Sequence, residues 1–216
     1  MTAPTTRRLL SLTAVSALAL CMTACGGDAE ETASSTPSPT SSPSASADQE
    51  VSTVAVYEDF ACPHCKDFHV GAGGFLTSVA QGGTAEVDYR IVDFLGQGDE
   101  ESWSTRAANA FYCFRETTED PNVQHDYQTE LFSAAPAGLS DEQLIAQAEA
   151  LDGDIADCVA QDGGSAQIQS ALDGMSEDGV RGVPSVVVDG TVYDPQSDGD
   201  LMDWVLDQAN LSRATS

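Results

Sequence analysis

Two cysteines separated by two residues carry the clearest chemistry in this sequence. The motif Cys62-Pro63-His64-Cys65 follows a run rich in β-branched residues at 51–57, which is typical of a buried strand. Apolar residues at helical spacing come after the motif. The motif is therefore predicted to lie where a strand ends and a helix begins, with Pro63 in the first helical turn, where a proline is tolerated.

A cysteine at such a junction has the properties of a nucleophile. The unpaired N–H groups and the positive dipole end of the helix stabilise a thiolate at Cys62, and His64 adds charge or a hydrogen bond. Cys62 is therefore predicted to be the sulfur attacked in a disulfide exchange, and Cys65, one turn further along, resolves the mixed disulfide. Both cysteines are expected to be exposed and close to each other.

Two other uses of the motif fit the sequence less well. With His64 and His69 it would form half of a zinc site, but no second CxxC or HxxxH follows. A purely structural disulfide between Cys62 and Cys65 would close a very short loop, which gains little chain entropy. We therefore expect a redox pair, with no metal and no other cofactor.

A second signal lies about 120 residues downstream of the first. The residues SVVV at 185–188 are predicted to form a strand, with Asp189-Gly190 as a two-residue hairpin turn. Val183-Pro184 directly precedes this strand. A proline in that position, after glycine and valine, is a candidate for a cis peptide bond.

Taken together, CPHC after a strand and GVPSVVVDG downstream resemble the DsbA-type thiol–disulfide oxidoreductases of the thioredoxin superfamily. The resemblance covers about residues 51–210 and implies an α/β, thioredoxin-like fold with an inserted helical domain. It also implies that Val183 and Pro184 face the disulfide and help to bind an unfolded substrate. The family often has a buried acid six residues before the first cysteine, where this chain has Val56. Glu58 is then either a substitute proton relay or an exposed acid near the strand end.

The long stretch between a strand predicted at 85–95 and the proline motif shows helical periodicity. A helical insertion is expected at about 97–178, within a folded domain that spans 51–212. Cys113 and Cys158 fall on these helices beside apolar residues. In an exported chain a structural disulfide between them is the favoured interpretation, and a second redox relay is the alternative.

The first 24 residues have the layout of an export signal. An arginine pair at 7–8 precedes an apolar stretch at 9–20, which is too short for a permanent membrane helix. The sequence MTAC at 22–25 resembles the bacterial lipoprotein box, so Cys25 is predicted to carry a lipid. An ordinary signal peptide cleaved nearby is the alternative, and both the general secretory and the twin-arginine routes stay open.

The segment at 25–50 is rich in Ser, Thr and Pro and has no aromatic or branched aliphatic residue. It is predicted to be a disordered linker between the lipid and the folded domain. The whole chain has 8 Lys and Arg against 35 Asp and Glu, a formal net charge of -27. Because such a charge repels a phosphate backbone, nucleic acid is excluded as a partner.

These features predict an exported thiol–disulfide oxidoreductase, anchored by lipid at the extracytoplasmic face of the cell membrane. The leading hypothesis is a monomeric oxidase that donates the Cys62–Cys65 disulfide to unfolded or reduced exported proteins. The resemblance implies a quinone-linked membrane partner that reoxidises the pair. The same residues suit a reductase or an isomerase, for example in cytochrome maturation. A non-catalytic lipoprotein that binds a partner is the alternative from another class.

Overall fold

The computed structural model describes residues 51–215, with side chains as far as residue 210. The predictions for 1–24, for 25–50 and for Cys25 therefore lie outside the described residues. In chain order the elements are β1 (Thr53–Glu58), α1 (Pro63–Gln81), β2 (Glu86–Ile91), α2 (Trp103–Arg115), α3 (Pro121–Ala134), α4 (Asp141–Glu149), α5 (Ala156–Val159), α6 (Ser165–Glu177), β3 (Ser185–Val188), β4 (Thr191–Val192) and α7 (Leu201–Thr215). No helix among the described residues is long and apolar enough to cross a membrane.

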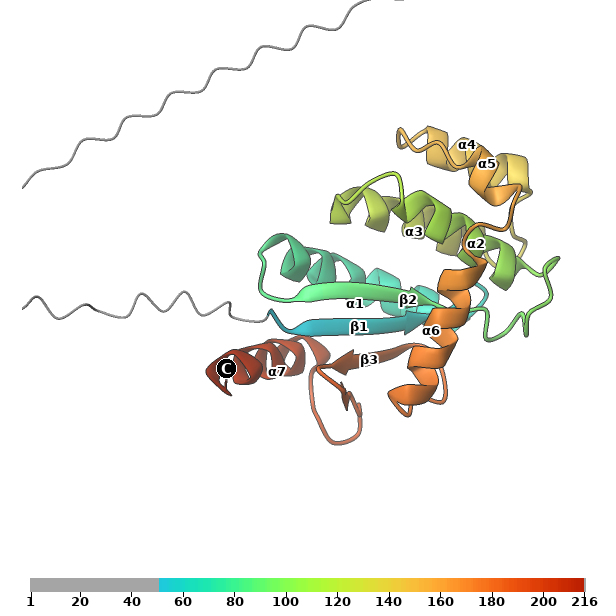
Figure 1. Cartoon of the computed structure of the whole chain (residues 1–216). Helices are drawn as coiled ribbons and strands as arrows, with labels where there is room; N and C mark the ends of the chain where they lie inside the picture. Colours follow the sequence, from blue (N-terminus) through green and yellow to red (C-terminus); the bar gives the residue numbers. More distant parts are fainter. Residues whose placement is uncertain (1–50, 216) are drawn as a thin grey trace, which may run out of the picture. The chain divides into compact units, whose positions relative to one another are not determined.

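A four-stranded sheet with the order β2-β1-β3-β4 forms the centre of the domain (Figure 1). β1 pairs in parallel with β2 and antiparallel with β3, and β3 pairs antiparallel with β4. Residues 54–57 of β1 are all buried, because helices cover both faces of this strand. That burial explains why the sequence of β1 is almost continuously apolar.

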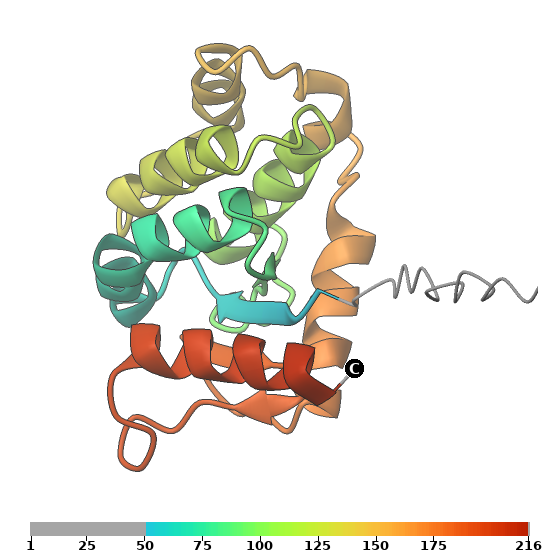
Figure 2. The same cartoon turned by 90° about the vertical axis from the view of Figure 1, so that its left-hand side faces the viewer.

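Helices cover the two faces of the sheet unequally (Figure 2). α1 and α7 pack on one face, where Leu76 and Val205 join the same core as Val54 and Val56 of β1. α6 packs on the other face against a smaller apolar cluster that contains Tyr57. This arrangement, together with the helices α2–α6 between β2 and β3, is the predicted thioredoxin-like α/β fold with a helical insertion.

The strand predicted at 85–95 is shorter in the structure, and the prediction was wrong at its C-terminal end. β2 stops at Ile91, and the N–H of Val92 makes one more ladder-like bond to the carbonyl of Glu58 at 2.9 Å. Asp93 then turns the chain, because its carboxylate accepts from the N–H of Gly98 at 3.2 Å and the hydroxyl of Thr105 at 3.1 Å. Apolar residues beyond Ile91 thus belong to a turn.

A pair of histidines joins the insertion to α1. His69 of α1 is 3 % exposed, and its Nε2 lies 2.8 Å from the hydroxyl of Thr129 on α3. Its ring stacks on that of His125 with 4.4 Å between the ring centroids. Burial, together with the nearby His125, lowers the pKa of His69 to about 4. His69 is therefore a neutral packing residue that fixes α3 against the helix of the CxxC motif.

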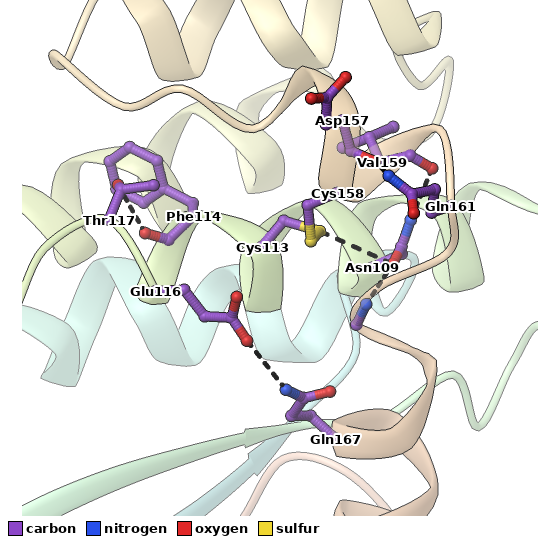
Figure 3. The surroundings of a disulfide bond; sticks show 11 residues. Asn109, Cys113, Phe114, Glu116, Thr117, Asp157, Cys158, Val159, Gln161 and Gln167 are labelled. Atoms are coloured by element: carbon purple, nitrogen blue, oxygen red, sulfur yellow. Dashed lines mark hydrogen bonds between the residues drawn. A yellow bond between two sulfur atoms is a disulfide. The ribbon is translucent and has the colours of Figure 1, made fainter. Parts of the chain in front are cut away.

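Cys113 of α2 and Cys158 of α5 are bonded to each other (Figure 3). Asn109, one turn before Cys113, accepts a hydrogen bond from the N–H of Gly164 at 2.7 Å, so the chain after α5 is tied to α2. A Cβ at Gly163 would lie 2.6 Å from the sulfur of Cys158. The disulfide therefore closes a loop that holds α3, α4 and α5 against α2.

Replacing both Cys113 and Cys158 by alanine should destabilise the domain without removing its thiol chemistry. The bond spans a sequence separation of 45 residues, and closing such a loop contributes about 4 kcal/mol in the chain-entropy model. Denaturant unfolding measures the loss, and alkylation of Cys62 serves as the control for the active pair. A variant that is as stable as the wild type but loses turnover would show instead that the distal pair is a redox relay.

Candidate active site

Cys62 is the N-cap residue of α1, at the junction that the sequence predicts. Its backbone is extended, with φ -86° and ψ 118°, and Pro63 opens the helix. Its N–H donates to the carbonyl of Asp59 at 2.9 Å, and its carbonyl accepts from Lys66 at 3.2 Å. Its thiol lies 3.8 Å from the carbonyl oxygen of Val183 and donates to it. The first sulfur thus lies at the positive end of the helix.

The two thiols are far less exposed than predicted. Cys62 is 6 % exposed and Cys65 is 0 % exposed, whereas Pro63 and His64 are exposed. The expectation of an exposed pair was wrong, because the start of α1 packs down onto the sheet and the segment at Val183 covers Cys62. Of the two sulfurs, Cys62 therefore keeps some exposed surface for a substrate, and Cys65 has none.

The segment of Val183 and Pro184 reaches the cysteines because of the sheet topology. β3 runs antiparallel to β1 with Ser185 opposite Tyr57, so the residues just before β3 lie at the carboxyl end of β1. The peptide bond between Val183 and Pro184 is cis. The structure therefore brings the two sequence motifs together, with the carbonyl of Val183 as the group next to the thiol of Cys62.

Cys65 lies in surroundings that disfavour its thiolate. Burial raises the pKa of the Cys65 thiol, and the nearby acid Glu58 and thiol Cys62 raise it further. The N–H of Asp59 donates to its sulfur at 3.5 Å and opposes this shift. At neutral pH the unbonded Cys65 is therefore a thiol. A thiolate that forms on Cys65 when the disulfide opens has to take up a proton to reach this stable form.

Glu58 is the last residue of β1 and is completely buried. The interpretation of Glu58 as an exposed acid was therefore wrong. Because side chains alternate along a strand, Glu58 points to the same face as Val56, which is the face that α1 covers. Neither carboxyl oxygen has a hydrogen-bond partner, and burial raises the pKa of Glu58 well above its usual range.

Asp59 is a site residue that the sequence interpretation missed. It is fully buried, and its carboxylate accepts from the N–H of Ala61, the N–H of Leu95 and the hydroxyl of Ser104, each at 2.8 Å. These bonds tie the loop before Cys62 to the start of the insertion. The one available signal was an acid three residues before the first cysteine, which alone does not distinguish a buried anchor from a surface residue.

The described residues include no group of three or more His, Cys, Asp or Glu that would hold a metal ion. His69, which the zinc interpretation requires, lies between α1 and α3 against Thr129. Clefts of about 540 and 460 Å³ flank α6, and neither is lined by Cys62 or Cys65. The two sulfurs, the Glu58 carboxyl and the Val183 carbonyl are the groups that the structure gathers at the CxxC motif.

Comparison with known families assigns residues 47–207 to a thioredoxin family. The chain belongs to this family. Among solved structures, reduced DsbA from Mycobacterium tuberculosis is 24 % identical with a TM-score of 0.56, over 76 % of this chain and 88 % of that one. MdbA, a thiol-disulfide oxidoreductase from Corynebacterium diphtheriae, is 20 % identical with a TM-score of 0.63, over 76 % and 86 %. The catalytic domain of Proteus mirabilis ScsC is 18 % identical with a TM-score of 0.53, over 76 % and 86 %. A comparison with curated proteins found no match.

The contrast between the two thiols predicts selective alkylation of the reduced protein. Iodoacetamide at pH 7 should modify Cys62 first, because its sulfur lies at the N-terminus of α1, while burial raises the pKa of Cys65. Peptide mass mapping at short times gives the ratio of the two products, which we expect to exceed about tenfold. Cys62→Ser is the control and should leave Cys65 almost unlabelled; equal labelling of both thiols would contradict the assignment.

Proposed function

We propose that the chain is a thiol–disulfide oxidoreductase in which Cys62 is the exchanging sulfur and Cys65 the resolving one. The observation that carries this proposal is the placement of Cys62 at the start of α1, with Cys65 one turn inside and the unpaired Glu58 carboxyl buried on the same side of the sheet. Two structural relatives with this fold are described as DsbA and as a thiol-disulfide oxidoreductase, which supports the same chemistry here.

The exchange proceeds in two balanced steps. A substrate thiolate attacks the sulfur of Cys62, the Cys62–Cys65 bond breaks, and the electron pair leaves on Cys65. Glu58 gives its proton to the Cys65 thiolate. A second substrate thiolate then attacks the substrate sulfur of the mixed disulfide, and Cys62 leaves as a thiolate that the helix start and His64 stabilise. The substrate is oxidised to a disulfide, and the enzyme is reduced to a dithiol.

The resting state of Glu58 suits the opening of the enzyme disulfide. A carboxyl group buried without a partner is held in its protonated form. It is then ready to act as an acid when the electron pair leaves on Cys65, and as a base when the disulfide forms again. The oxidase direction, with donation of the Cys62–Cys65 disulfide to newly secreted proteins, is proposed from the histidine of the CPHC motif.

Substrates of this oxidase are unfolded or reduced exported proteins. Val183 and Pro184 lie beside Cys62, where they would hold an extended substrate chain. Each turnover leaves the enzyme reduced by two electrons, so a second protein must accept them. A quinone-linked membrane partner fits this need, and the enzyme acts as a monomer.

The reduction potential of the Cys62–Cys65 pair tests the direction. An oxidase should lie far above the value of about -270 mV that thioredoxin shows, toward about -120 mV. Equilibration with glutathione buffers followed by thiol trapping gives the value. The Cys113→Ala/Cys158→Ala variant isolates the pair, and Cys62→Ser is the inactive control. A potential near that of thioredoxin would identify a reductase, and an absence of any exchange would identify a non-catalytic binding protein.

We further propose that Cys25 carries a lipid that anchors the mature protein to the outer side of the cell membrane. Support comes from its place at the end of the apolar stretch and from the Ser-, Thr- and Pro-rich composition of 25–50. The wild type should sediment with membranes, and Cys25→Ser should appear in the soluble exported fraction. Recovery of the wild type in that soluble fraction would disprove the anchor.

A further inference from the structure

The buried carboxyl of Glu58 would need a hydrogen-bond donor in its charged form, and in the structure it has none. Both oxygens are buried and lack a hydrogen-bond partner, and none of the ion pairs among the described residues includes Glu58. A neutral carboxylic acid tolerates this state. Once Glu58 has given up its proton, the carboxylate is a buried charge without a donor, which is strongly unfavourable. A donor must therefore be available nearby for the charged state.

Tyr89 of β2 supplies such a donor. In the parallel pairing Tyr89 lies opposite Val56 and Ile91 lies opposite Glu58, so the side chains of Tyr89 and Glu58 leave adjacent strands on the same face of the sheet. Tyr89 is 8 % exposed, and its buried hydroxyl also lacks a partner. Two unpartnered polar groups thus lie on neighbouring strands beneath α1, although buried polar groups in proteins are usually paired.

Electrostatic coupling links these groups to the reacting sulfur. The charge of Glu58 acts on the hydroxyl of Tyr89 and on the thiol of Cys65. The titratable groups on which Glu58 acts are Cys65 from α1 and Tyr89 from β2. The three side chains of Glu58, Tyr89 and Cys65 therefore form one buried unit.

We propose that Tyr89 is a positioning residue for disulfide exchange, whose hydroxyl donates a hydrogen bond to the Glu58 carboxylate that forms when Glu58 protonates Cys65. The bond is made directly after a small side-chain rotation or through one bridging water. Tyr89 keeps its own proton throughout, so the proton moves from Glu58 to Cys65 and later returns to Glu58 from solvent. This inference rests on the exchange reaction proposed above.

A tyrosine suits this task because it stays a donor. Burial, with Glu58 nearby, raises the pKa of Tyr89, so its hydroxyl is protonated at every working pH. A hydrogen bond to an ionised group is about twice as strong as one between neutral groups. The hydroxyl therefore stabilises the charged intermediate more than the neutral resting state.

A double-mutant cycle on the full-length protein tests the inference. The rate at which the oxidised enzyme is reduced by dithiothreitol is measured by stopped-flow tryptophan fluorescence in the wild type, Tyr89→Phe, Glu58→Gln and the double variant. Tyr89→Phe should slow the wild type about tenfold, in line with loss of a hydrogen bond to a charged group. In the Glu58→Gln background the same change should have less than about a twofold effect, because no carboxylate forms there.

Tyr112→Phe is the matched control. Tyr112 is also buried, and its hydroxyl donates at 2.9 Å to the carbonyl of Ile91 in the same strand as Tyr89. Removing this hydroxyl perturbs the packing at β2 but does not touch Glu58. Its exchange rate should stay within about twofold of the wild type. A comparable slowing in Tyr112→Phe and Tyr89→Phe would overturn the inference, because both effects would then come from packing.

The pH profile of Tyr89→Phe gives a second readout that needs no Glu58 variant. Glu58 acts as an acid, so its contribution falls as the pH rises through its pKa. Loss of the donor in Tyr89→Phe destabilises the carboxylate and so raises the pKa of Glu58. The pH at which the exchange rate begins to fall should therefore be higher in Tyr89→Phe than in Tyr112→Phe. An unmoved limb, or equal slowing by Tyr89→Phe in both backgrounds, would overturn the inference while leaving the oxidoreductase proposal intact. A wild type that does not react with dithiothreitol would overturn both.

Discussion

The constraint on which the active site depends is the burial of a sulfur that must carry charge during exchange. Cys65 has no exposed surface, and burial raises the pKa of its thiol. When the disulfide opens, the electron pair that lands on Cys65 cannot be solvated by water. In the proposed exchange the proton therefore comes from inside the protein, where the charge of the fully buried Glu58 acts on the Cys65 thiol. Cys62 differs because its sulfur lies at the N-terminal end of α1, where unpaired N–H groups point outward.

The fold provides this arrangement through contacts between segments that are distant in sequence. β1 ends at Glu58, and the loop after it is held by the bonds of Asp59 to the start of the insertion. The stacked pair of His69 and His125 fixes α3 on the helix that begins at Cys62. The insertion therefore does more than add length to the thioredoxin-like sheet. It packs α3 against one side of the CxxC helix, whose first turn lies over the buried Cys65 and Glu58.

The sequence predicted those parts of the site that depend on local pattern. The strand-to-helix junction at Cys62, the helical stretch after 97 and the hairpin after Pro184 all follow from periodicity and turn chemistry. The low exposure of Cys62 and the anchoring role of Asp59 could not be predicted. The low exposure of Cys62 depends on Val183, which lies 121 residues further along the chain. The anchoring role of Asp59 depends on Ser104, which lies 45 residues away. The end of β2 at Ile91 likewise depends on side-chain bonds of Asp93 that periodicity does not reveal.

The two cysteine pairs show that surroundings, and not the presence of two nearby thiols, decide which pair exchanges. Cys113 Sγ lies 3.9 Å from the neutral amide oxygen of Asn109, and a Cβ at Gly163 would collide with the sulfur of Cys158. If the Cys113–Cys158 bond opened, a thiolate on Cys113 would lie beside the neutral amide oxygen of Asn109, which has no proton to give. Cys65, in contrast, lies near the carboxylic acid of Glu58. A leaving group without a proton source is a poor one in a buried site. The same physical argument therefore supports the proposed exchange at the pair above Glu58 and the proposed structural role of the pair beside Asn109.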